Sequence, residues 1–385
     1  MTDTMTTFDA RRGMYTANKL KLGLFCQNAS GARLMTKVPE RWSGSWEDNV
    51  KLSRMCDDAG IDFLLPIARW KGYPGETNFQ CSTFETLTWA TGILALTKNI
   101  TVFATVHVPL VNPIAAAKML VTADHVGQGR VGLNIVVGWN EDEFGMFGVP
   151  QRPEADRYPY AQEWIDVVKR IWTETDEFDF DGKFLHMKNV EGNPKLIGAE
   201  RPLMMNAGTS PAGRVYAITN CDAFFTSTGM MTFDEVAGKV ETFKREARSY
   251  GRELDVFSDG IVVCRPTQEE AEEYFHYAAI ENADWEGVEL RLNRRATSKK
   301  SIAPGAMERA DFEIERERWI KGVVGRNMIG DPDSVARQLA DLHFAGLSGM
   351  ALNFVNYLDE LPYFRAEVLP RLERMGLRTK VRATA

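Results

Sequence analysis

Strand-like and helix-like segments alternate along almost the whole chain. Eight short runs rich in branched apolar residues are separated by longer segments whose apolar residues recur every three or four positions. The eight runs are residues 20–26, 62–66, 100–108, 130–138, 203–208, 222–228, 256–264 and 349–354. This alternation indicates a parallel α/β fold, because each strand needs a crossover helix to return to the same end of the sheet.

The fourth run, RVGLNIVVG at residues 130–138, is apolar at nearly every position. Such runs are typical of parallel strands that are buried on both faces. An open doubly wound sheet carries a glycine fingerprint after its first strand, but residues 27–31 read QNASG and do not match it. Eight strands are the number that closes a barrel. The sequence therefore predicts an α/β protein with the (β/α)8 TIM-barrel architecture.

The chain is longer than a minimal barrel needs. It has 385 residues, whereas a barrel of this class takes about 250. We expect one barrel domain over residues 1–385, with the surplus in extended loops and three segments. Residues 1–18 are expected to be a flexible N-terminal segment, residues 178–190 a hairpin insertion around an Asp-Gly turn, and residues 284–308 a mobile lid loop.

Composition and charge exclude several classes of protein. Apolar residues make up 44% and charged residues 26% of the chain, which indicates neither a disordered chain nor a disulfide scaffold. The net charge of −7 gives no general attraction to nucleic acid or to an anionic membrane. The N-terminal residues lack an apolar signal-peptide core and no apolar stretch is long enough to span a bilayer, so we expect a cytoplasmic protein.

The common motifs of metal, nucleotide and hydrolase sites give no positive identification. Residues 127–132 (GQGRVG) have the spacing of a dinucleotide fingerprint, but they precede a strand instead of following one. The five histidines include no pair three or four residues apart, and the five cysteines form no CxxC, so no metal site is expected. The absence of GxSxG disfavours an α/β-hydrolase.

The candidate site follows from the barrel, because active sites of such barrels lie at the carboxyl ends of the strands. Those positions are rich in uncharged hydrogen-bonding groups and poor in carboxylates; they are Gln27, residues 66–69, 105–108, 134–139, 206–210 and 227–229, and Asn353. They lack the paired carboxylates of a glycosidase and a lysine for Schiff-base chemistry. They suit a site that holds a cofactor which carries the chemistry itself.

Two segments have the features of an anion site. Residues 207–213 (AGTSPAG) end one strand and begin a helix at Ser210, where free backbone N–H groups and a hydroxyl meet. Arg157 and Tyr158 open the helix that follows the fourth strand. Together they predict a phosphate clamp, although a plain serine N-cap and a surface arginine also account for these residues.

Several longer stretches resemble one family. They are FETLTWATGILALTKNITVFATVHVPLVNPIAAAKM, ADHVGQGRVGLNIVVGWNEDEF, DRYPYAQEWIDVVKRIWT, DFDGKF, NAGTSPAGR and MIGDP. With them the chain resembles the bacterial luciferase-like flavin monooxygenases over about residues 20–375, in particular the branch that holds pyrimidine, dimethylsulfone and alkanesulfonate monooxygenases. The resemblance implies a barrel with insertions, reduced FMN supplied by a separate NAD(P)H-dependent flavin reductase, and O2 as co-substrate.

The resemblance also implies roles for individual residues. The positions that match the family's flavin-binding residues are Ala68, Arg69, Asn134, Glu143, Arg157, Tyr158 and Ser210, the last three at the phosphate. The positions expected to be catalytic are Thr105 and Asn134, which match a pair that holds O2 at the flavin, the wall residue Trp139, and His107.

His107 departs from the pattern of the pyrimidine monooxygenases, in which this position is small. Two interpretations stay open for it. It is either a substrate contact or an acid/base group, which its ordinary pKa allows, or a histidine at the barrel mouth that is bonded to its neighbours.

The function implied by the resemblance is a two-component FMN-dependent monooxygenase acting on a small organic molecule. The Thr105–Asn134 pair favours oxidative cleavage of a C–N or C–halide bond through a flavin peroxide. C–S cleavage of a sulfone or sulfonate, a deazaflavin-dependent dehydrogenase and a non-catalytic flavin-binding protein are the alternatives. The partners implied are a flavin reductase and further copies of the chain, as a homodimer or homotetramer. The sequence does not indicate which substrate or which reductase is used.

Overall fold

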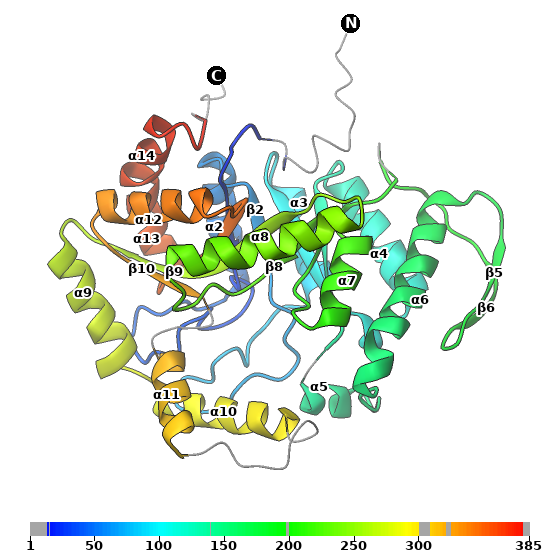
Figure 1. Ribbon diagram of the computed structural model, residues 1–385, viewed down its shortest axis with the longest axis horizontal. Coiled ribbons are helices and arrows are strands. Elements are labelled where there is room, and N and C mark those ends of the chain that lie inside the picture. The colour runs from blue at the N-terminus through cyan, green and yellow to red at the C-terminus, as the bar shows by residue number, and fades with distance from the viewer. Residues whose placement is uncertain are drawn as a thin grey trace, which may run out of the picture.

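The computed structural model of the protein describes residue 14 and residues 16–138, 140–197, 200–299, 309–320 and 325–379. Its central feature is a closed barrel of eight parallel strands (Figure 1). In order around the barrel they are β1 (Lys21–Phe25), β2 (Phe63–Leu65), β3 (Thr101–His107), β4 (Val131–Val136), β7 (Leu203–Asn206), β8 (Ala223–Phe225), β9 (Asp255–Cys264) and β11 (Gly349–Asn353). Pairing of β11 with β1 closes the ring, so the predicted TIM barrel is confirmed.

Helices connect the strands and cover the outside of the barrel. They include α2 (Trp46–Asp58), α3 (Thr86–Leu96), α4 (Pro113–Val126), α6 (Glu154–Thr173), α7 (Pro211–Asn220), α8 (Phe233–Ser249), α12 (Pro332–Phe344), α13 (Tyr357–Glu367) and α14 (Leu369–Arg374). Local signals set several of their starts. The Asn112 side chain caps α4 just before Pro113. Thr267 and Glu270 form the capping box of α9 (Gln268–His276).

Aromatic side chains fill the inside of the barrel. The rings of Phe63 and Phe103 meet edge to face with centroids 6.0 Å apart, and those of Phe63 and Phe257 with centroids 5.5 Å apart. All three side chains are fully buried. Because the barrel is a packed core, chemistry is confined to its ends, and the polar strand ends identified above lie at the carboxyl end.

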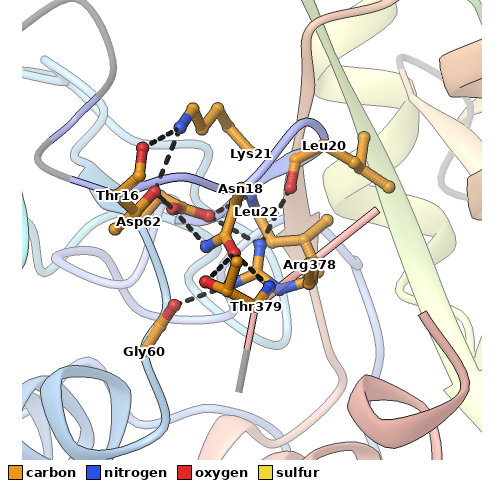
Figure 2. A network of polar contacts seen from close by, with 9 residues as sticks. All are labelled: Thr16, Asn18, Leu20, Lys21, Leu22, Gly60, Asp62, Arg378 and Thr379. Atoms are coloured by element: carbon orange, nitrogen blue, oxygen red, sulfur yellow. Dashed lines mark hydrogen bonds and ion pairs between the residues drawn. The ribbon is translucent and has the colours of Figure 1, made fainter. Parts of the chain in front are cut away.

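A buried ionic network occupies the opposite, amino-terminal end of the barrel (Figure 2). Asp62, directly before β2, accepts hydrogen bonds from Thr16 Oγ1 (2.5 Å), Asn18 Nδ2 (2.8 Å), the Leu22 N–H (2.8 Å) and Arg378 Nη1 (2.6 Å). Arg378 also donates to two backbone carbonyls, one before β1 and one before β2. The network therefore ties β1, β2 and the C-terminal segment together.

The largest difference from the sequence expectation lies at residues 284–308. The sequence indicates a loop there, whereas residues 285–299 form the helix α10 (Trp285–Lys299). Residues 300–308 lie outside the described residues. Two side chains of helix α10, Val288 and Leu292, belong to a buried cluster with rings from the loop after β2.

The connection from α10 back to the barrel also holds elements that the sequence pattern does not indicate. Helix α11 (Arg309–Ile320) is followed by β10 (Arg326–Gly330), which adds a ninth strand to the sheet of the barrel. This strand pairs with residues 260–264 of β9, beyond the part of β9 that pairs with β8. Figure 1 shows α10 and α11 at the end of the molecule opposite to α14, together with α5 (Glu141–Met146).

Two further segments and one property of the helices bear on the expectations. Within residues 178–190, β5 (Phe178–Asp181) and β6 (His186–Val190) pair antiparallel. Of residues 1–18, residues 1–13 and 15 lie outside the described residues, while Asn18 is buried. In the parts of the chain that the structure describes, no helix is long and apolar enough to cross a membrane.

Candidate active site

Asn134 and Thr105 lie side by side at the carboxyl half of neighbouring strands, because β3 and β4 pair Thr105 with Asn134 in register. Asn134 Nδ2 lies 3.2 Å from Thr105 Oγ1, and Thr105 Oγ1 donates its proton to the Pro66 carbonyl at 2.6 Å. Thr105 can therefore only accept from Asn134, which assigns the Asn134 amide nitrogen to this contact. Asn134 Oδ1 is left buried with no hydrogen-bond partner among the described residues. A ligand or an ordered water would satisfy it, because an unpaired buried acceptor is costly.

Arg69 and Glu143 form a buried ion pair above the end of β2. Arg69 Nη1 donates to Glu143 Oε1 at 3.1 Å, and both side chains are about 95% buried or more. The same carboxylate oxygen accepts the backbone N–H groups of Trp70 (3.0 Å) and Lys71 (3.3 Å). Gln80 Oε1 accepts from Arg69 Nε at 3.3 Å. Glu143 thus holds the loop after β2 in place, which the sequence pattern does not indicate.

His107 ends β3 and is buried in the barrel mouth, with 6% of its surface exposed. Its Nδ1 atom has no hydrogen-bond partner among the residues that the structure describes. Burial lowers the pKa of His107 to about 4, against an opposing effect of Glu143 and with a smaller contribution from Arg69. The imidazole is therefore neutral near pH 7 and is equipped to donate or accept a hydrogen bond without carrying charge.

His107 makes the stability of the fold depend on pH between about 6.5 and 4. Because its pKa in the folded state is lowered to about 4, the unfolded chain binds a proton in this range that the folded chain does not, and stability is lost as the pH falls. A difference of one bound proton changes the free energy of unfolding by at most about 1.4 kcal/mol per pH unit. We expect the free energy of unfolding in urea to fall less steeply in His107→Gln than in the wild type between pH 6.5 and 4.5. If the free energy of unfolding fell equally steeply with pH in both proteins, His107 would not be a buried, neutral imidazole in the folded state.

Tyr158 of α6 and Ser210 at the start of α7 meet across a pair of glycines. A Cβ on Gly208 would lie 2.1 Å from the Tyr158 hydroxyl oxygen, and one on Gly213 would lie 2.6 Å from it. Ser210 Oγ caps α7 by accepting the Gly213 N–H at 3.1 Å, and it lies close enough to Tyr158 to oppose the rise in the pKa of that hydroxyl. Burial raises the pKa of Tyr158 to about 12, so the group stays a hydroxyl.

The other residues of the expected clamp and flavin site are placed less closely together. Arg157 is half-buried, and its Nε donates to the Arg152 carbonyl at 3.0 Å. Ala68 is half-buried in the loop after β2, beside Arg69. Trp139 lies outside the described residues. The structure thus brings together three pairs of the predicted residues, Asn134 with Thr105, Arg69 with Glu143, and Tyr158 with Ser210.

The sequence model of the protein family described as luciferase-like monooxygenase matches residues 20–349, which is most of the chain. The chain belongs to the luciferase-like monooxygenase family. The FMNH2-dependent dimethylsulfone monooxygenase of Pseudomonas putida is 27% identical over 360 residues, which cover 92% of this chain and 96% of the relative. The pyrimidine monooxygenase RutA of Acinetobacter baylyi is 26% identical over 358 residues, which cover 91% and 94%. The solved structure of riboflavin lyase (RcaE) shares the fold, with a TM-score of 0.83 at 20% identity over 94% of this chain and 93% of that chain.

This luciferase-like monooxygenase also has site groups that sequence reasoning missed. Arg33 Nη2 lies 2.8 Å from Asp259 Oδ2, and both side chains are buried. Arg33 stands in an irregular segment after β1, so no periodicity marks it. The available signal was Asp259, a carboxylate inside the apolar run of β9. The sequence indicates Gln27 only as a strand end, yet its side chain is fully buried and neither amide atom has a partner in the described ranges.

Helix α10 lies over the loop that follows β2. The guanidinium carbon of Arg291 is 5.1 Å from the centre of the Tyr73 ring, and that of Arg69 is 5.4 Å from the same ring. Both arginines are buried. The helix therefore covers the loop held by Glu143, and a lid role for it stays a prediction.

Proposed function

We propose that this luciferase-like monooxygenase takes reduced FMN from a separate NAD(P)H-dependent flavin reductase and uses O2 to oxidise a small organic substrate. The observation that carries the proposal is the buried Asn134 amide, fixed by Thr105 and left with an unpaired oxygen in the barrel mouth. The names of the relatives support it, because one is an FMNH2-dependent dimethylsulfone monooxygenase and another a pyrimidine monooxygenase, and each is matched over more than nine-tenths of its length.

The residues present fit a bound FMN. The Tyr158 and Ser210 hydroxyls, next to the N-terminus of α7, would hold the phosphate, with Arg157 adjacent in the chain. Asn134 would meet the flavin ring from β4, and Ala68 and Arg69 from the end of β2. Glu143 would act mainly by fixing Arg69 and the backbone after it. When bound, reduced FMN supplies the electrons that activate O2.

We assign different tasks to Asn134 and Thr105. The Thr105 proton is committed to the Pro66 carbonyl, so Thr105 acts as a positioning residue for the Asn134 amide. The second Asn134 N–H is then available to donate to dioxygen, and Oδ1 to accept from a ligand N–H or O–H. Neutral His107 would bind the substrate. Because these groups are buried, water is excluded, and polar contacts in such a site are stronger than in solvent.

We further propose that the substrate is neutral and that a C–N bond is cleaved. Each of the two arginines Arg33 and Arg69 has its own carboxylate partner, and His107 is neutral at pH 7. The groups left to bind substrate are amide and imidazole atoms that donate and accept hydrogen bonds, which suits a cyclic amide. C–S cleavage of a neutral sulfone is the second candidate, and the 27% identity to a dimethylsulfone monooxygenase favours it.

A coupled assay tests the proposed function. The protein is mixed with FMN, NADH, any flavin reductase and ¹⁸O2, and given uracil, dimethylsulfone or methanesulfonate in turn. We expect one ¹⁸O atom in the product of a neutral compound and no turnover of the anion. Turnover confined to dimethylsulfone would replace C–N by C–S cleavage. The absence of ¹⁸O in every product, with oxidised FMN tightly bound, would favour a non-catalytic flavin-binding protein.

Gly208→Ala should weaken the binding of reduced FMN at least tenfold. The added methyl group would lie 2.1 Å from the Tyr158 hydroxyl oxygen, so the hydroxyl must leave the proposed phosphate position. Anaerobic titration of the flavin-free protein with reduced FMN measures the effect. Gly145→Ala in α5 is the control, because a Cβ there meets no heavy atom within 4 Å. An unchanged dissociation constant in Gly208→Ala would show that Tyr158 does not hold the phosphate.

A further inference from the structure

A cavity of about 400 Å³ lies outside the barrel wall, between α7 and α8. Its volume is within the range of small-molecule binding sites. Thr209 and Arg214 come from the start of α7, Phe224 and Thr226 from β8 and the residue after it, and Lys239 and Glu246 from α8. The lining includes Thr209 but neither Ser210 nor Tyr158, so the cavity is separate from the proposed phosphate position.

The cavity has an apolar floor. Phe224 and Phe243 stack with ring centroids 4.0 Å apart and planes 12° apart, and Val240 and Val256 lie beside them. All four side chains belong to the buried layer between the strands and the helices. A ligand that enters the cavity would therefore place an apolar body against this floor.

Gly238 borders open space at the cavity. It stands in the middle of α8, where glycine costs about 0.5–1 kcal/mol relative to alanine. It lines the cavity, and a Cβ built on it would meet no heavy atom within 4 Å. Neither a positive φ nor close packing requires glycine here, in contrast to Gly208. The helix thus leaves space in the wall of the cavity at a cost in helix stability.

Two polar groups at the cavity could bind an anionic ligand. Thr226 is 3% exposed, and its Oγ1 atom has no hydrogen-bond partner in the described part of the chain. Lys239 Nζ donates to the Ser227 carbonyl at 2.7 Å and faces no carboxylate in a described ion pair. Burial lowers the pKa of Lys239, and an anion beside it would offset that loss of hydration.

The other charges of the lining are already balanced. Arg214 Nε lies 2.8 Å from Glu246 Oε2, and Arg214 Nη1 donates to the Thr209 carbonyl at 3.1 Å. The lining therefore carries one positive charge in excess, that of Lys239. The cavity thus offers an apolar floor, one ammonium group without a carboxylate partner and one unpaired hydroxyl. A matching ligand has an apolar body and one anionic group that accepts hydrogen bonds.

We propose that this cavity is a second ligand site, which binds a small apolar molecule bearing a single carboxylate or similar anionic group. The anionic group lies between Lys239 and Thr226, and the apolar body lies on the Phe224–Phe243 floor next to Gly238. Because Thr209 lines the cavity, an occupant would contact the turn that carries Ser210.

Calorimetric titration of the flavin-free, full-length protein with benzoate tests the proposal, and benzamide serves as the neutral probe of the same shape. We expect saturable binding of benzoate at one site and at least tenfold weaker binding of benzamide. Gly238→Leu, which fills the open space, and Lys239→Met should each weaken benzoate binding at least tenfold. The assay needs neither flavin nor turnover, so its outcome is independent of the proposed monooxygenase function.

Two control variants make the result specific. Gly238→Ala adds a methyl group that meets nothing, and Lys244→Met removes another ammonium group of α8 that donates to a backbone carbonyl away from the cavity. Both should bind benzoate within about twofold of the wild type. No saturable binding to the wild type, equal binding of benzamide, or wild-type binding to both Gly238→Leu and Lys239→Met would overturn the proposal. If Gly238→Leu fails to fold, Lys239→Met and the benzamide comparison decide it.

Discussion

Asn134→Ala is expected to lower the rate of product formation about 100-fold while NADH consumption continues, with hydrogen peroxide as the replacement product. The expectation rests on one buried amide that Thr105 holds in a fixed orientation, with its oxygen left for a ligand. Removing a single preorganised hydrogen-bonding group from an active site typically costs about 10²–10³ in rate. The ratio of product formed to NADH oxidised, with peroxide measured in parallel, reports the effect directly.

Variants of Thr105 separate positioning from direct contact. Thr105→Val keeps the shape but loses the hydroxyl that accepts from Asn134, so coupling should fall about tenfold, less than in Asn134→Ala. Thr105→Ser keeps the hydroxyl and should stay close to the wild type. Full coupling in both Asn134→Ala and Thr105→Val would exclude the proposed role of this pair in holding oxygen. A larger loss in Thr105→Val than in Asn134→Ala would instead make Thr105 the direct contact.

The sequence predicts the barrel well because its strands are buried on both faces and stand out as apolar runs. Helix α4 illustrates how local chemistry adds to this pattern, since Asn112 and Pro113 mark its first turn. Strand β10 and helix α10 lack such signals. Their places depend on packing against β9 and against the loop after β2, contacts that no local pattern carries.

The candidate site likewise contains residues that the strand pattern places and residues that only the folded chain brings together. Thr105 and Asn134 stand at strand ends, and the parallel register of β3 and β4 makes them neighbours once the barrel closes. The pair Arg33–Asp259 joins residues 226 positions apart, one of them in an irregular segment, and only the folded chain brings them together. The contact of Tyr158 with Gly208 is similar, because nothing local shows that a hydroxyl takes the place of a Cβ.

The network at the amino-terminal end of the barrel yields the second large effect, on stability instead of activity. Arg378→Met is expected to lower the free energy of unfolding by about 3–5 kcal/mol, the usual result when one partner of a buried ion pair is removed. The side chains of Arg378 and Asp62 are 4% and 0% exposed, so water cannot replace the missing guanidinium. Equilibrium unfolding in urea measures the loss.

Arg371→Met is the matched control, because Arg371 also lies near the C-terminus and pairs with Asp333 at 2.6 Å, but that carboxylate is 68% exposed. Its loss should cost less than about 1 kcal/mol. Adding Asp62→Asn to Arg378→Met should recover part of the lost stability, since no unpaired charge is then buried. A loss in Arg378→Met as small as that expected for Arg371→Met would mean that the C-terminal segment contributes little to closing the barrel. A loss confined to Arg378→Met, partly reversed in the double variant, would show that the cost comes from the uncompensated Asp62 carboxylate (Figure 2).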